Sequence, residues 1–283
     1  MSVDALQEKI RKTKNPCVLC LDAAGDCVPP QFDGLCAYYE ALLRRLKGVI
    51  PGVRVSFGSF ALLGGEGLRL LARITELAAE LGYYVILDAP ELLSAQAAEQ
   101  AAGVLGAEDC GFAWNGLVLP AYGGSDMVRP FAKLTKNGKA LFPVVRTANR
   151  SAAELQDLLS GSRLVYMAAA DKVSRQGVEL IGRSGYSQVA GVGPASSADS
   201  LRNLREKYKN LFLLIDGYDY SNSNAKNCSF AFDKLGHGAI ACAGSGITAA
   251  WDTDTSEGTD YIAQVVEAAE RMKKNLLRYI TVL

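Results

Sequence analysis

Residues 83–93 read YYVILDAPELL, a nearly unbroken apolar run that closes on the carboxylate of Asp88. Such a run is typical of a parallel strand covered on both faces. The preceding segment, residues 66–81, carries leucine and alanine at helical spacing, and Gly82 suits the position just past a helix end. We therefore predict a helix followed by a buried strand that presents Asp88 at its carboxyl end.

The same alternation of short strands and longer amphipathic segments extends along the chain. We predict strands at residues 16–22, 53–57, 83–88, 117–120, 140–146, 188–193, 211–216 and 239–243. Predicted helices cover residues 32–47, 66–81, 94–105, 126–133, a segment capped by Ser151, 199–208 and 259–278. Eight such units over about 250 residues indicate a (β/α)₈ barrel of the α/β class, in one domain spanning residues 1–283. An open doubly wound sheet is the alternative, although no G-x-G-x-x-G motif opens a helix after a strand. Residues 164–169 form a surplus apolar run that fits either strand or helix.

The composition narrows the function classes. Hydrophobic residues make up 49% of the chain, enough for a full core, and 30 basic residues balance 30 acidic ones. This balance gives no electrostatic footprint for nucleic acid or for an anionic membrane surface. Residues 1–14 are polar, and no apolar run reaches the ~18 residues needed to span a bilayer. We expect a cytoplasmic protein.

Seven cysteines occur, and Cys17 and Cys20 form a C-x-x-C pattern. The pattern lies in an apolar, strand-like run without a second such pair, so buried thiols are a better interpretation than a metal site. An odd number of cysteines also argues against a secreted disulfide framework. We expect no metal.

Three predicted strands end in a carboxylate, namely Asp22, Asp88 and Asp216. In a barrel these ends meet at the face where active sites are built. Arg54 and Arg146 are the cations near enough to pair with them. The cluster is open to two interpretations, a functional site or structural ion pairs at the rim.

A glycine turn, Gly244-Ser245-Gly246, follows the eighth predicted strand. Its backbone N–H groups are candidates for phosphate binding, because barrels often hold phosphate near strands seven and eight. The lone histidine, His237, precedes that strand on the opposite face, so we interpret it as structural.

Two further segments carry a resemblance to a known family. Residues 118–131 read VLPAYGGSDMVRPF, and residues 142–149 read FPVVRTAN. Together with Asp22 and Asp88 at strand ends, they resemble the orotidine 5′-phosphate decarboxylases of the longer bacterial type, over residues 15–251. The resemblance implies a (β/α)₈ homodimer that works without a cofactor. We expect a site for a small molecule, nucleotide-like if it follows the family, that includes Ser56, Arg146, Thr147 and the turn at residues 244–246.

The chain departs from this family where the chemistry resides. The family motif Asp-x-Lys-x-x-Asp, whose lysine protonates the carbanion left by CO₂, aligns with residues 88–93, where Pro90 replaces the lysine and Leu93 the last aspartate. Arg54 takes the place of another lysine, and Ser56 that of an asparagine. The phosphate-clamping arginine falls on Ser245, and the segment after strand seven, Asp216 to Ser221, is acidic. The catalytic candidates that remain are Asp22, Asp88 and Arg54.

Three functional hypotheses follow. The first is a decarboxylase-like barrel that has lost its activity and acts as a small-molecule binder or scaffold. The second is an enzyme with changed chemistry that uses Asp22, Asp88, Glu91 and Arg54. The third is an active decarboxylase of pyrimidine biosynthesis with an unrecognised arrangement, for which Lys172 would be the replacement lysine.

Overall fold

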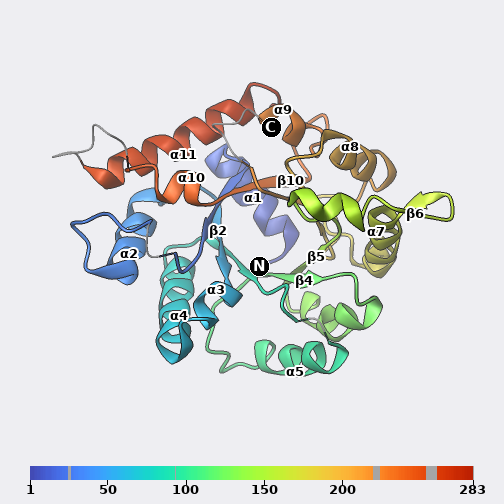
Figure 1. The fold of residues 1–283 in the computed structure, drawn as a ribbon, viewed down its shortest axis with the longest axis horizontal. Helices are drawn as coiled ribbons and strands as arrows, with labels where there is room; N and C mark the ends of the chain where they lie inside the picture. Colours follow the sequence, from blue (N-terminus) through green and yellow to red (C-terminus); the bar gives the residue numbers. More distant parts are fainter. Residues whose placement is uncertain (25–26, 93, 219–223, 253–259, 283) are drawn as a thin grey trace.

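A computed structural model describes the chain except residues 25–26, 93, 219–223, 253–259 and 283. Eight parallel strands close into a barrel with the order β1-β10-β9-β8-β5-β4-β3-β2, ringed by helices (Figure 1). This confirms the (β/α)₈ prediction and excludes the open sheet. The barrel strands are β1 (Cys17–Leu21), β2 (Gly52–Ser56), β3 (Tyr84–Asp88), β4 (Gly116–Pro120), β5 (Ala140–Val144), β8 (Gly191–Pro194), β9 (Leu213–Asp216) and β10 (Ala239–Ala243).

Helices pack around the barrel strands and bury their apolar faces against them. The longer ones are α1 (Val3–Thr13), α2 (Gly34–Leu46), α4 (Gly64–Glu80), α5 (Ala95–Leu105), α7 (Val165–Gln176), α8 (Ala198–Lys207) and α11 (Tyr261–Leu277). Shorter ones are α3 (Phe57–Ala61), α6 (Ala132–Thr135), α9 (Ala225–Ser229) and α10 (Ser245–Thr248). No helix in the described part of the chain has the length and apolar character needed to cross a bilayer.

Some segments differ from the sequence-based predictions. The surplus run at residues 164–169 is helical, as the start of α7. The helix predicted at residues 126–133 is two 3₁₀ turns, Ser125–Met127 and Arg129–Phe131, followed by α6. The predicted cap at Ser151 is wrong, because the segment is a 3₁₀ helix (Arg150–Glu154) that begins after Asn149. A small hairpin, β6 (Leu159–Ser160) with β7 (Arg163–Leu164), projects from the barrel and was not predicted (Figure 1).

The barrel interior is filled by side chains at alternate strand positions. Because side chains alternate across a strand, residues two apart share a face, and the inward set forms its own apolar cluster. The cluster includes Val18, Tyr84, Ile86, Val118, Phe142, Val192, Phe212, Leu214, Ile240 and Cys242. The next inward positions toward the carboxyl ends are Asp22 after β1, Ser56 on β2, Asp88 on β3 and Asp216 on β9. The apolar interior therefore gives way to a polar mouth.

Helix α1 closes the opposite end of the barrel. Its apolar residues Val3, Leu6 and Ile10 belong to the interior cluster and are fully buried. Two glutamines fix it in place. The backbone N–H of Val3 donates to Gln188 at 2.7 Å, and Gln7 accepts from the N–H of Gly238 at 3.1 Å. The sequence alone indicates only that residues 1–14 are polar and does not predict this helix.

Candidate functional site

A cavity of about 580 Å³ opens at the carboxyl ends of β1, β2, β3, β9 and β10. It brings together most of the predicted site, namely Asp22, Arg54, Ser56, Asp88, Gly244, Ser245 and Gly246. We call this cavity the acidic pocket, because three of its lining residues, Asp22, Asp88 and Asp216, are carboxylates.

Arg54 crosses the floor of the acidic pocket. It points inward from β2, and its guanidinium reaches both a neighbouring strand and a distant one. Nη2 lies 2.8 Å from Asp88 Oδ2 on β3, and Nη1 lies 2.5 Å from Asp216 Oδ1 on β9. Arg54 is only 8% exposed. The predicted pairing of Arg54 with strand-end carboxylates is therefore present.

Burial and oppositely charged neighbours have opposite effects on the pKa values of Arg54 and Asp88. Burial lowers the pKa of Arg54, but the charges of Asp88 and Asp216 outweigh it and raise that pKa above its usual value. For Asp88, burial raises the pKa, the guanidinium of Arg54 lowers it, and Asp216 raises it further, with a net increase. These directions agree, because one guanidinium serves two carboxylates. The positive charge of Arg54 therefore does not fully offset the effect of burial on the pKa of Asp88.

Two further polar side chains of the pocket accept hydrogen bonds from nearby backbone N–H groups. Asp22 Oδ1 accepts from the N–H of Ala24 at 3.0 Å. Ser56 Oγ accepts from the N–H of Ser59 at 3.3 Å and thereby caps α3. The glycine turn leads into α10, a helix of one turn, with Ser245 and Gly246 exposed at the rim.

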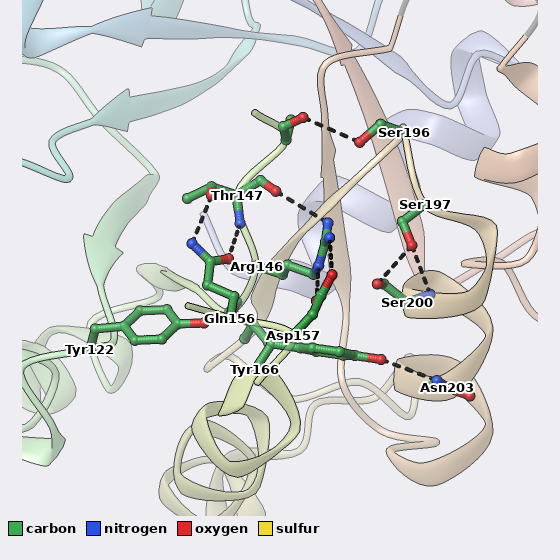
Figure 2. Close-up of polar contacts among 12 residues, drawn as sticks. Tyr122, Arg146, Thr147, Gln156, Asp157, Tyr166, Ser196, Ser197, Ser200 and Asn203 are labelled. Atoms are coloured by element: carbon green, nitrogen blue, oxygen red, sulfur yellow. Dashed lines mark hydrogen bonds and ion pairs between the residues drawn. The ribbon is translucent and has the colours of Figure 1, made fainter. Parts of the chain in front are cut away.

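Arg146 and Thr147 lie apart from this pocket, in a polar network beyond β5 (Figure 2). Arg146 makes two parallel bonds of 2.8 Å to Asp157, from Nε to Oδ1 and from Nη2 to Oδ2. Thr147 is bonded at both its N–H and its hydroxyl to Gln156, at 2.9 and 2.8 Å. The predicted pairing of Arg146 with a strand-end carboxylate is wrong, because the chain folds back after β5 and offers Asp157 instead. Neither Arg146 nor Thr147 is among the described residues that line the acidic pocket.

The Arg146–Asp157 pair gives a prediction for acid stability. Its hydrogen bond from Arg146 lowers the pKa of Asp157 below the usual value. A carboxyl whose pKa is lower in the folded state stabilises the fold above its unfolded pKa, about 4, and loses that contribution as the pH falls. We expect Asp157→Asn to be less stable than the wild type at pH 7 and to lose less stability on acidification. Urea unfolding between about pH 7 and pH 3 measures this. Parallel curves for the two proteins would contradict it, and Asp199→Asn, at an exposed helix position, is the control.

Seven of the described lining residues were absent from the predicted site, among them Asp216, Cys20 and Cys242. The sequence marks Asp216 as a strand end. Its ion pair with Arg54 depends on the closed barrel, because two strands lie between β2 and β9, and no local pattern predicts it. Cys20 and Cys242 also line the pocket. Strand alternation offered a signal for both, because each stands two residues before a predicted site position, Asp22 and Gly244.

The segment after β3 carries the remaining predictions. Pro90 begins the turn that leaves β3 and does not line the pocket as described. Glu91 lies against α3, where the missing side chain of Gly58 leaves it room, and burial together with Asp88 raises its pKa. Leu93 lies outside the described residues, as do Asp219 to Ser221 of the acidic segment after β9. Lys172 is exposed on α7, and His237 lies before β10, at the end away from the pocket.

No protein-family model matches the chain. Individual relatives do match along almost its whole length. The orotidine 5′-phosphate decarboxylase of Clostridium kluyveri is 28% identical over 261 residues, which cover 89% of this chain and 88% of the relative. That of Clostridium novyi is 26% identical over 259 residues, 88% of this chain and 89% of the relative. The chain resembles the orotidine 5′-phosphate decarboxylases.

Solved structures with that name share the fold. The orotidine 5′-monophosphate decarboxylase of Leishmania donovani superimposes with a TM-score of 0.72 at 19% identity, over 98% of this chain and all of that one. The Plasmodium berghei enzyme gives a TM-score of 0.76 at 10% identity, over 97% and 99% of the two chains. The chain therefore shares the barrel fold of these structures.

Proposed function

We propose that this chain is a decarboxylase-like barrel that does not decarboxylate orotidine 5′-phosphate and binds a small molecule in the acidic pocket. The observation that carries the proposal is the position of Arg54. Its guanidinium is held between Asp88 and Asp216 at the floor of the pocket, with Pro90 where the resemblance implies the proton-donating lysine.

Proton donation is the step that these residues do not support. The described lining of the pocket includes no lysine, and none of the residues outside the described ranges is a lysine in the sequence. Arg54 is no substitute, because a guanidinium stays protonated in proteins and its carboxylate partners raise its pKa further. Each tenfold of lost rate corresponds to about 1.4 kcal/mol of transition-state stabilisation. A decarboxylase without its proton donor would therefore lose several such factors of ten, which supports the proposal that this chain does not turn over orotidine 5′-phosphate.

The test is an assay of the purified chain with orotidine 5′-phosphate, with the Clostridium kluyveri relative as the positive control. We expect no turnover above the uncatalysed background, at an enzyme concentration at which the control enzyme converts all of the substrate within the dead time of the assay. Turnover that disappears in Asp88→Ala would overturn the proposal. It would favour an active decarboxylase with an unrecognised arrangement.

One observation favours a second candidate, an enzyme with changed chemistry. The side chain of Asp88 is only 15% exposed, its pKa is raised, and one of its oxygens, Oδ1, has no hydrogen-bond partner among the described groups. A carboxyl in that state is suited to general acid or base catalysis. Under this candidate, a ligand found for the pocket is converted, and Asp88→Asn abolishes conversion even at ligand concentrations that saturate the variant.

A further inference from the structure

The acidic pocket carries more negative than positive charge. Among its described lining residues Arg54 is the one cation, facing the carboxylates of Asp22, Asp88 and Asp216. The residues outside the described ranges supply no compensation, because none of them is a lysine or an arginine in the sequence. The guanidinium of Arg54 is already shared between Asp88 and Asp216, and no cation of the described residues forms an ion pair with Asp22.

Two buried atoms on the floor also lack partners. Asp88 Oδ1 and Arg54 Nε are inaccessible to solvent and make no hydrogen bond with the described groups. An unsatisfied buried acceptor costs free energy that a donor from a ligand would recover. A neutral donor supplies the hydrogen bond alone, whereas a cationic N–H donor also neutralises charge and makes the stronger bond.

We propose that the acidic pocket binds a small organic cation of the ammonium or guanidinium class, with Asp22 and Asp88 as its carboxylate partners. This inference rests on the proposed binding function and names its ligand class. The cavity of about 580 Å³ suits a small molecule. A phosphate dianion is repelled at this mouth by the same carboxylates that attract a cation.

The ligand class is tested with matched probes on the purified chain. Putrescine and agmatine are the cations, butane-1,4-diol is the uncharged analogue of putrescine, and uridine 5′-monophosphate is the anion. We expect both cations to raise the melting temperature and to give saturable heats in titration calorimetry, since a ligand that binds only the native state stabilises it. The diol and the nucleotide should do neither. Equal shifts from putrescine and the diol, no shift from either cation, or preferential binding of the nucleotide would each overturn the proposal.

Two variants locate the site. Asp22→Asn removes one carboxylate and should weaken cation binding about tenfold or more, the effect of one lost charged hydrogen bond. Gly246→Lys adds a cation at the rim, where a side chain meets open space, and should abolish binding without touching any carboxylate. Asp199→Asn, at an exposed position on α8, removes the same charge elsewhere and should leave the affinity unchanged. If Asp22→Asn and Asp199→Asn behave alike, or Gly246→Lys binds as the wild type does, the assignment is wrong.

The two proposals fail in different ways. Decarboxylation of orotidine 5′-phosphate contradicts the proposed function whatever the pocket binds. Tight binding of the nucleotide without turnover leaves a binding function in place and overturns only the cationic ligand class.

Discussion

Replacing Arg54 with methionine should lower the free energy of unfolding by about 3 kcal/mol, the lower end of the range for removing one partner of a buried ion pair. Methionine keeps much of the side-chain length but leaves Asp88 and Asp216 facing each other without a cation. The side chain of Asp88 is 15% exposed and that of Asp216 33%, so water relieves the second carboxylate more than the first. Urea unfolding at pH 7 measures the change, and a loss below about 1 kcal/mol, the size of a surface pair, would contradict it.

The pH dependence of the stability of Arg54→Met shows whether the unpaired carboxylates cause the loss. Without Arg54, the pKa of Asp88 rises further above its unfolded value, because burial and Asp216 raise it and the opposing guanidinium is gone. A carboxyl with a raised folded pKa destabilises the fold at high pH, and this cost shrinks as the pH falls toward the unfolded pKa of about 4. The deficit of Arg54→Met should therefore be smaller at pH 5 than at pH 8. The double variant Arg54→Met/Asp88→Asn should regain part of the lost stability, whereas additive losses would show that the two residues do not interact.

Replacing Arg205 with methionine should also cost about 3 kcal/mol, because several buried acceptors lose one shared donor. Arg205 is 7% exposed on α8 and donates to four backbone carbonyls, those of Tyr208, Lys209, Ala231 and Gly238. Burial lowers the pKa of its guanidinium, and the carbonyls supply hydrogen bonds without a countercharge. Its loss releases the connection from α8 to β10.

The matched control is Arg202→Met on the same helix. Arg202 is partly exposed and forms an ion pair with Asp199 one turn away, so the loss should not exceed about 1 kcal/mol. Thermal or urea unfolding of both variants gives the comparison. Equal losses for the two arginines would mean that the buried carbonyl contacts of Arg205 contribute nothing beyond a surface pair.

Periodicity was enough to predict the barrel. All eight strands lie within or close to their predicted ranges, because a strand that is covered on both faces has a short apolar run as its sequence. Residues 164–169 show where this signal ends, since the same composition suits a buried helix. Helix α1 was missed because the segment is mostly polar and its few apolar residues are buried only by strands far along the chain.

The candidate site was predictable to the extent that it depends on strand ends. Asp22, Asp88 and Ser56 reach one pocket because parallel strands of a barrel end on one face. The partner of Arg146 was not predictable, because Asp157 belongs to an irregular segment whose path no pattern encodes. The resemblance placed Arg146 and Thr147 at a ligand, and that role stays a prediction, as does the homodimer.

The seal formed by α1 has a consequence for how the chain reaches its native state. Its hydrogen bonds join residues separated by 185 and 231 positions. Helix α1 can therefore dock only after the ribosome has synthesised β8 and β10. Contacts of such high sequence separation slow folding, since the loop must be closed before the contact repays its entropy. During synthesis the apolar lining of the unclosed barrel is exposed to whatever surrounds the ribosome. This is the interval in which aggregation competes with folding.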